Sequence, residues 1–356
     1  MSCTFILRLK KSVKCILIIV VLIVSLNLTF ISRGILQLNR NEKIISKKLN
    51  WLKNNISTAL SKPCTKGSTA QTFHPEETKN ICSQVKVDLR LPQRRHFLVN
   101  HEHKLLYCWI HKVASTSWIA LFSHLANRTH IDEYYREIRI LSPKSAEELH
   151  GIITTKDYYK LIVVRHPFER LVSAYRDRIE DTSRFTSQAW IYVPRIFALT
   201  RPVLNRNKIF DINHNQKLSI VPTFQEFVEW LLVIPPKKYD VHWNRYSDHC
   251  KPCAIHYDAI IKMENFSNEK EVSVMHNMEL ELLNASLPHL QRTSGGPTDY
   301  NITCQYFQQL FSEQVSALYE IYSMDFEMFH YSPQLYINCA QNKSGQTDLS
   351  VPNATP

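Results

Sequence analysis

The feature that most constrains the fold of this 356-residue chain is a buried-strand pattern that runs directly into a helix pattern, twice. Residues 105–110 are continuously apolar, and residues 118–125 then carry apolar side chains at i, i+3, i+4 and i+7. Residues 161–164 and 168–179 repeat this order. Two strands that each lead into a helix predict an α/β fold. Its central, mainly parallel sheet is flanked by helices, with ligands bound at the carboxyl ends of the strands.

Glycine is too scarce for the usual phosphate-binding loops. Only six glycines occur, which is about 2% of the chain against a usual content of roughly 7%. Neither G-x-G-x-x-G nor G-x-x-x-x-G-K-[ST] can be written from their positions. This excludes the standard dinucleotide, protein-kinase and Walker A loops, so a phosphate cradle here has to use other small residues.

The formal charge of +11 is concentrated at the amino terminus. Residues 1–50 contain nine basic side chains and one acidic side chain, and the remainder contains 34 basic and 31 acidic ones. Basic residues are expected beside a membrane segment, so the excess charge does not indicate a nucleic-acid partner.

A 17-residue uncharged run at residues 15–31 predicts a signal-anchor transmembrane helix, with residues 1–14 as a cytoplasmic tail. A cleaved signal peptide is the alternative, but the run is longer than a normal h-region and lacks a clear cleavage site. Residues 32–80 are predicted as a lumenal stem, 81–335 as the folded domain, and 336–356 as a loose tail.

Sequons and cysteines agree with a lumenal location. Seven N-x-S/T sequons predict glycosylation, at Asn55, Asn127, Asn265, Asn284, Asn301, Asn342 and Asn353. Seven cysteines follow the apolar run, and most of them should form disulfides, whose connectivity the spacing leaves open. The run His249-Cys250-x-x-Cys253-x-x-His256 could instead bind zinc, but a second Cys-x-x-Cys pair is absent, and we predict no metal.

Each strand-to-helix turn carries residues suited to an anion. In the first, Ser115–Ser117 supply hydroxyls at a helix amino terminus and Lys112 adds a mobile charge; the alternative is an N-cap cluster with an exposed lysine. In the second, Arg165 ends a buried strand, where an unpaired cation is costly, and Ser173 lies on the helix face left by the apolar residues. An Arg165–Glu169 ion pair is the alternative there. Together the turns predict one site for a ligand with two anionic groups.

These two turns carry a family resemblance. Residues 107–118 (YCWIHKVASTSW) resemble the 5′-phosphosulfate loop of Golgi carbohydrate sulfotransferases, and residues 164–177 (VRHPFERLVSAYRD) resemble their 3′-phosphate motif. Segments at 222–228, 242–243, 250–253, 257–258, 319–326 and 329–331 are similar, in the same order, to the branch of chondroitin and dermatan 4-sulfotransferases, GalNAc 4-sulfotransferases and the HNK-1 sulfotransferase. The chain departs from the common pattern at four positions, namely His111, Ser115, Ser117 and His166.

The resemblance implies a P-loop-like sulfotransferase fold and the donor 3′-phosphoadenosine 5′-phosphosulfate, with no metal required. It places Lys112 at the transferred group, and we add His242 as the general base, although a packed structural histidine is the alternative. The implied donor-binding residues are His111, Lys112, Val113, Ala114, Ser115, Thr116, Ser117, Arg165, His166, Pro167, Phe168, Glu169, Arg170, Leu171, Val172 and Ser173.

The expected acceptor is a glycan, with the 4-hydroxyl of GalNAc in chondroitin or dermatan as the first hypothesis. An acid-free stretch predicts a polyanion-binding strip of Arg195, Arg201, Arg206 and Lys208, with an ordinary solvated loop as the alternative. The resemblance implies a single-pass type II protein of the Golgi membrane and leaves a homodimer open. A glucuronate or N-glycan GalNAc acceptor, a lumenal kinase or nucleotidase, and an inactive glycan-binding glycoprotein are the competing hypotheses.

Overall fold

The computed structural model describes residues 81–83, 90–128, 130–183, 186–204, 209–211, 217–265, 268–280, 287–288 and 296–341. The predicted cytoplasmic tail, signal anchor and stem lie outside these residues, as do Cys64 and most of the predicted carboxyl-terminal tail. Among the described residues, no helix combines the length and the apolar character needed to cross a membrane.

A four-stranded sheet forms the centre of one half of the fold. Its strand order is β1-β2-β3-β6, with bounds Phe97–Asn100, Leu105–Cys108, Tyr159–Val164 and Ala259–Lys262. β2, β3 and β6 are parallel, whereas β1 pairs antiparallel with β2 through a tight connection. Nearly every strand residue is buried, as expected for a sheet covered on both faces. The predicted α/β class and central sheet are confirmed, with an antiparallel edge strand added.

Helices account for most of the remaining described chain. The α-helices are α3 (Ser115–Leu125), α4 (Tyr134–Leu141), α5 (Ala146–Thr154), α6 (Pro167–Tyr175), α7 (Ser187–Thr200), α8 (Phe224–Val233), α9 (Tyr246–His249), α10 (Asn268–Asn277), α11 (Tyr300–Phe307), α12 (Ser312–Met328) and α13 (Gln334–Ile337). Shorter elements are the 3₁₀ turns η1 (Arg94–His96), η4 (Pro236–Lys238) and η5 (Met263–Asn265), the π-helical turn η2 (Arg176–Glu180), and a small hairpin of β4 (Phe210–Asp211) and β5 (Lys217–Leu218).

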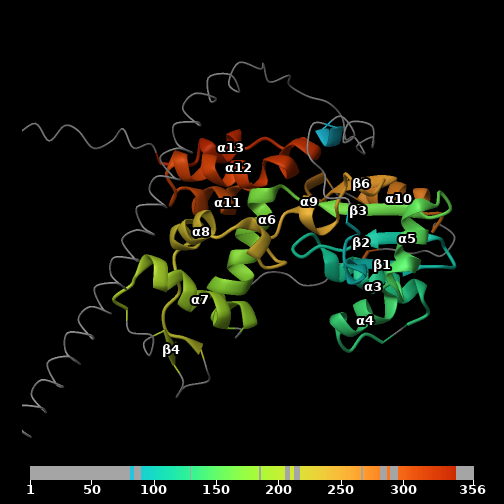
Figure 1. Ribbon diagram of the computed structural model, residues 1–356, viewed down its shortest axis with the longest axis horizontal. Helices are drawn as coiled ribbons and strands as arrows, with labels where there is room; N and C mark the ends of the chain where they lie inside the picture. The colour runs from blue at the N-terminus through green and yellow to red at the C-terminus, as the bar shows by residue number, and fades with distance from the viewer. Residues whose placement is uncertain are drawn as a thin grey trace, which may run out of the picture. The chain divides into compact units, whose positions relative to one another are not determined.

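Two hydrophobic clusters hold these elements together. One surrounds the sheet and includes the apolar face of α3, with Trp118 and Phe122 almost fully buried. The other is helical and aromatic, and joins α6 to α7, α8, α11 and α12 around Phe168 and Trp243. Figure 1 shows α6 between the sheet strands and these later helices. The helix that follows β3 therefore contributes its apolar face to the helical cluster, while its first residue lies at the end of a sheet strand.

Three disulfides confirm the predicted oxidised cysteines. They join Cys82 to Cys253, Cys108 to Cys250, and Cys304 to Cys339. Both cysteines of the Cys250-x-x-Cys253 run are therefore used in bonds to distant partners, and His249 Nε2 lies 3.1 Å from the Trp109 carbonyl oxygen. In this disulfide-bonded form neither cysteine of the run has a thiolate to offer to a zinc ion.

Candidate functional site

The turn between β2 and α3 is a cradle built without glycine. Lys112 and Ala114 adopt left-handed backbone angles, with φ of 71° and 59°, at two positions where a glycine would be expected. Ala114 is the N-cap of α3, and no side chain caps the helix there. The alternative of a serine N-cap cluster with an exposed lysine is therefore wrong for this turn. The first turn of α3 instead faces a cavity, at the end of a helix where anions are favoured.

The turn between β3 and α6 is fixed by His166. Its Nδ1 accepts a hydrogen bond from the Phe168 backbone N–H at 3.2 Å, and its Nε2 lies 3.1 Å from the Ser332 carbonyl oxygen. This pair of contacts assigns the neutral Nε2–H tautomer. Pro167 then occupies the first helical position, which suits proline because no hydrogen-bond donor is needed there. Burial lowers the pKa of His166 to about 4, so the imidazole is neutral at physiological pH.

Arg165 precedes this cap, and its guanidinium contacts three groups. Nε lies 3.4 Å from Glu169 Oε2, Nη1 lies 3.5 Å from the Lys112 carbonyl oxygen, and Nη2 donates to the Thr298 carbonyl oxygen. Arg165 therefore forms the ion pair with Glu169 that the sequence offered as the alternative, and it also lines the cavity. Burial raises the pKa of Glu169, and the Tyr336 hydroxyl donates to its other oxygen at 2.7 Å. The pairing within the protein holds Arg165 in place.

The ammonium group of Lys112 faces η2, the turn that continues α6. Its Nζ lies 3.0 Å from Asp177 Oδ2, and Arg178 Nε lies 2.9 Å from the same oxygen. Asp177 and Arg178 lie on the π-helical turn η2, a rare conformation that often occurs at functional sites. Burial lowers the pKa of Lys112, and the ion pair with Asp177 opposes this effect. An arrangement of Lys112, Asp177 and Arg178 thus joins the first turn to η2.

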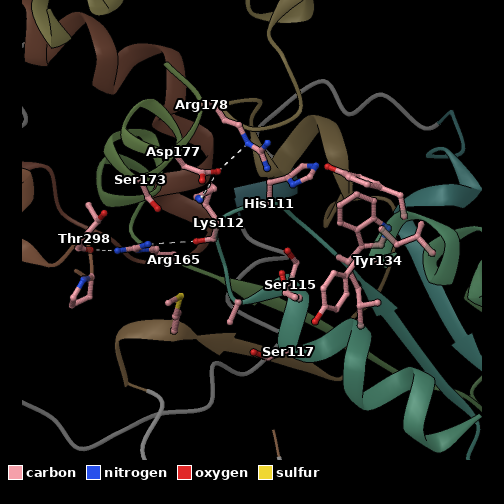
Figure 2. Close-up of a pocket in the computed structure, with 18 of the residues that line it drawn as sticks. His111, Lys112, Ser115, Ser117, Tyr134, Arg165, Ser173, Asp177, Arg178 and Thr298 are labelled. Carbon is pink, nitrogen blue, oxygen red and sulfur yellow. Dashed lines mark hydrogen bonds and ion pairs between the residues drawn. The ribbon is translucent and has the colours of Figure 1, made fainter. Parts of the chain in front are cut away.

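One cavity of about 840 Å³ brings both turns together. Figure 2 shows Arg165, Ser173 and Thr298 toward one end, Lys112 with Asp177 and Arg178 in the middle, and His111 and Tyr134 toward the other. From the predicted donor-binding set, the residues that line it are His111, Lys112, Ala114, Ser115, Thr116, Ser117, Arg165 and Ser173. The cavity therefore has a cationic half and an aromatic half.

The remaining residues of the predicted donor set support the site from behind. Val113, Phe168, Leu171 and Val172 are buried among apolar side chains, and Pro167 is buried at the start of α6. Each nitrogen of the Arg170 guanidinium donates within the fold, to the carbonyl oxygens of His111 at 3.0 Å, Asn244 at 2.6 Å and Val241 at 3.3 Å, and the group lies over the Tyr246 ring. Because Arg170 holds the His111 backbone, its effect on the cavity is through the position of the cradle.

His242, the predicted base, lies behind His111. The two rings are stacked, with centroids 3.9 Å apart, and His242 is 2% exposed. Its Nδ1 lies 2.5 Å from Asp240 Oδ1, and its Nε2 is buried with no hydrogen-bond partner among the described residues. Burial lowers the pKa of both His111 and His242, more so for His111. His111 lines the cavity and His242 does not.

The predicted basic strip is divided by the structure. Arg195 on α7 is exposed beside the Tyr192 ring, whereas Arg201 forms a two-point ion pair with Glu226, with contacts of 2.6 and 2.8 Å. Arg206 and Lys208 lie outside the described residues, as do the sequons at Asn55, Asn284, Asn342 and Asn353. Asn127 and Asn301 are exposed, and Asn265 lies in η5.

Several cavity residues were missed from the sequence. Asp177 lies four positions after Ser173, and this spacing is the signal that could have placed it on the same helix face. Tyr134, Tyr135 and Thr298 reach the cavity from segments that carry no motif. Only the folded chain brings them to this site.

Comparison with known proteins gives the family. The family described as "Sulfotransferase family" matches residues 95–332, which is most of the folded domain. Carbohydrate sulfotransferase 11 of Mus musculus is 29% identical over 260 residues, covering 68% of this chain and 69% of the relative. Carbohydrate sulfotransferase 8 of Mus musculus is 31% identical over 249 residues (66% and 56%), and carbohydrate sulfotransferase 10 of Danio rerio is 26% identical over 301 residues (74% and 75%). No solved structure matches the chain. The family match spans both turns, and each turn contributes a cation to the cavity. This chain therefore belongs to the sulfotransferase family and is a sulfotransferase enzyme.

Proposed function

We propose that this enzyme transfers a sulfuryl group from 3′-phosphoadenosine 5′-phosphosulfate to a sugar hydroxyl, and that the acceptor is the 4-hydroxyl of GalNAc in chondroitin or dermatan. One observation carries the proposal: Lys112 from the first turn and Arg165 with Ser173 from the second line the same cavity. The family implies this donor, and the named relatives are carbohydrate sulfotransferases.

The residues of the cavity fit a donor with two anionic ends. Arg165 and Ser173 would hold the 3′-phosphate, through charge-assisted hydrogen bonds that are stronger than neutral ones. Ser115, Thr116 and Ser117 at the start of α3 would hold the 5′-phosphosulfate, where backbone N–H groups and the helix dipole favour negative charge. The small side chain of Ala114 leaves room for close approach of the backbone.

Lys112 is the group we assign to the leaving oxygen. Transfer of a sulfuryl group needs little covalent work from a protein, so positioning and charge stabilisation supply most of the catalysis. The Lys112 ammonium is pointed toward Asp177 in the structure, at 3.0 Å, and it has to exchange part of that contact for the donor. Arg178, whose Nε lies 2.9 Å from the same carboxylate oxygen, keeps Asp177 in an ion pair while Lys112 moves.

The acceptor hydroxyl has to lose its proton during transfer. We assign this proton to a ring nitrogen of His111, the member of the stacked pair that lines the cavity, with His242 behind it; burial favours the neutral imidazole that a general base requires. Asp240 holds the Nδ1 side of His242 and so fixes the orientation of its ring. His111 provides the surface that the acceptor meets.

The cellular setting is part of the same proposal. A signal anchor at residues 15–31 would make this a single-pass type II protein of the Golgi membrane, acting on a glycan chain of a proteoglycan. The three disulfides and the exposed side chains of Asn127 and Asn301 support a lumenal catalytic domain. Retention in membranes after carbonate washing tests the anchor, and release of a soluble chain that begins near Arg33 would replace it with a cleaved signal peptide.

The donor assignment is tested on the purified full-length chain. Arg165→Ala should weaken the binding of adenosine 3′,5′-bisphosphate in calorimetry by roughly 2–5 kcal/mol, because a buried anion loses its charged partner. Lys112→Ala should lower kcat by at least about a hundredfold, the usual loss for one preorganised charge-stabilising group. Lys144→Ala, at an exposed lysine away from the cavity, is the matched control. Unchanged affinity in Arg165→Ala would remove that residue from the donor site.

The acceptor assignment is tested with labelled donor and a set of glycans. Desulfated chondroitin should accept the label, and lyase digestion should then give a 4-sulfated disaccharide. Label found only on a terminal glucuronate, or only on an N-glycan GalNAc, would replace the acceptor and leave the sulfotransferase assignment unchanged.

A further inference from the structure

The half of the cavity that faces away from Arg165 is formed by rings. Trp109 and His111 meet edge to face with centroids 5.0 Å apart, and His111 and Tyr135 lie 6.4 Å apart. We call Trp109, His111, Tyr134 and Tyr135 the aromatic wall, and all four line the cavity. Trp109 is fixed by its indole N–H, which donates to the Arg95 carbonyl oxygen at 2.7 Å.

Tyr135 is unusual among these rings because it is 48% exposed. It lies in the first turn of α4, whose buried residues Ile138 and Leu141 pack against the rest of the fold. Packing therefore holds the helix, while the Tyr135 ring is left open to the cavity. An exposed aromatic ring on a cavity wall offers a large, rigid apolar face with a polar tip, which suits a ligand with the same mixed character.

Charge is distributed unevenly along the cavity. The cationic side chains that line it are Lys112, Arg165 and Arg178, and Figure 2 shows Arg178 reaching as far as His111. The charged lining residues beside the aromatic wall are Asp132 and Glu133. These carboxylates are paired with side chains outside the lining, Asp132 with His130 and Arg136, and Glu133 with Arg139. A negatively charged group placed against Tyr134 and Tyr135 would thus have the two carboxylates of Asp132 and Glu133 beside it.

We infer that the aromatic wall is the subsite for the reacting sugar, and that it selects an uncharged pyranose ring over a uronate. This inference rests on the proposed function and deepens it. The apolar face of the ring lies on Tyr135, its hydroxyl faces His111, and Asp132 and Glu133 accept hydrogen bonds from other hydroxyls. Carboxylates of neighbouring sugars in a polymer then lie outside the cavity. A hexosamine satisfies these conditions, and a glucuronate as the reacting sugar does not.

The test uses the full-length enzyme with two acceptor oligosaccharides, one that ends in GalNAc and one that ends in glucuronate. Tyr135→Ala should raise the KM for the GalNAc acceptor by about tenfold, the scale of losing one ring contact. The affinity for adenosine 3′,5′-bisphosphate should stay unchanged. Tyr135→Phe keeps the ring and should behave like the wild type. Ile140→Ala is the matched control, because Ile140 lies on the same helix with the same 48% exposure and does not line the cavity.

A second variant tests the charge selection. Asp132→Asn with Glu133→Gln should raise the turnover of the glucuronate acceptor relative to the GalNAc acceptor. A wild-type preference for the glucuronate acceptor, or an unchanged KM in Tyr135→Ala, would overturn the inference.

Saturation-transfer NMR of the GalNAc oligosaccharide, without donor, separates this inference from the proposed function. Signal transfer that is lost in Tyr135→Ala supports the subsite even if adenosine 3′,5′-bisphosphate fails to bind, which would contradict the donor assignment alone. Equal transfer in the wild type and Tyr135→Ala overturns the subsite.

Discussion

At the scale of single residues, the cradle replaces glycine with two strained positions. A left-handed backbone costs an L-residue about 1–2 kcal/mol, and this chain accepts that cost at both Lys112 and Ala114. The surroundings hold the conformation: Arg170 donates to the carbonyl oxygen of His111, and Arg165 lies 3.5 Å from that of Lys112. Strain of this kind is maintained where function requires it.

Replacing Ala114 with glycine should relieve part of that strain. We expect Ala114→Gly to raise the free energy of unfolding by about 1 kcal/mol, because glycine adopts a positive φ without a steric cost. Chemical denaturation measures the change. The control is Ala198→Gly in the exposed interior of α7, which should lower stability by about 1 kcal/mol. Equal losses in the two variants would contradict the left-handed assignment.

His166 should make stability depend on pH. Its folded pKa of about 4 lies below the usual 6.5, so between these values the folded protein binds fewer protons than the unfolded chain. Stability from this group is therefore complete above pH 6.5 and is lost as the pH falls toward 4, by about 3 kcal/mol in total. Protonation of Nδ1 also removes the acceptor that caps α6.

The variant His166→Asn isolates this effect, because asparagine still caps a helix but does not titrate. Denaturation of both proteins at pH 7 and pH 4.5 should show a smaller loss in the variant. Asp325 acts in the opposite direction in both proteins: burial raises its pKa to about 6, so its contribution falls as the pH rises. Equal losses in wild type and variant would show that His166 does not couple to folding.

At the scale of elements, periodicity predicted the helices that face the sheet or the helical cluster. Trp118, Leu121, Phe122 and Leu125 are all buried on α3, and Ser173 lines the cavity from the face that the apolar residues of α6 leave free. The predicted strand at 105–110 ends earlier, at Cys108, because its pairing with β3 ends there. Such features are local, since they depend on spacing within one segment.

Features that join distant segments could not be predicted this way. Thr298 receives a hydrogen bond from Arg165, 133 positions away, and Tyr135 reaches the cavity only because α4 packs on α3. The stacking of His242 behind His111 likewise depends on tertiary packing, so the sequence marked the residue without showing that another ring covers it.

Within the predicted basic strip, the structure separates two roles. Arg201→Ala removes the ion pair with Glu226, and Glu226 also forms the capping box of α8 with Thr223. The free energy of unfolding should therefore fall by about 1 kcal/mol, and the KM for chondroitin should stay unchanged. Arg195→Ala should instead raise the KM at low salt and leave stability unchanged, because an exposed cation on a polyanion site is screened over about 8–10 Å at ordinary ionic strength. The two variants control each other. A KM rise in Arg201→Ala that matches the one in Arg195→Ala would mean that the ion pair opens to bind glycan.

At the scale of the whole molecule, disulfides connect the donor site to the rest of the domain. Cys108 is the last residue of β2, directly before the turn that forms the cradle, and it is bonded to Cys250, which follows α9. Three positions later, Cys253 is bonded to Cys82 near the start of the described chain. These bonds anchor the start of the cradle to a segment 142 positions away. A reducing compartment would remove this anchor, which agrees with a lumenal domain.

Removing either of two disulfides should lower stability, but only one of the two removals should also weaken donor binding. Cys108→Ser with Cys250→Ser should lower the free energy of unfolding by roughly 2–5 kcal/mol, and also weaken binding of adenosine 3′,5′-bisphosphate, because the end of β2 positions Lys112.

Cys304→Ser with Cys339→Ser removes a bond that closes a loop of sequence separation 35 instead of 142. Since the entropy of loop closure grows with the logarithm of length, its cost should be about 1 kcal/mol smaller. Cys304 and Cys339 lie on α11 and just after α13, outside the cavity lining, so donor affinity should stay at the wild-type value. Denaturation and calorimetry on the same preparations give both quantities. Equal donor affinity in the two double variants would show that the cradle keeps its shape without the Cys108–Cys250 bond, through the Arg170 and Arg165 contacts alone.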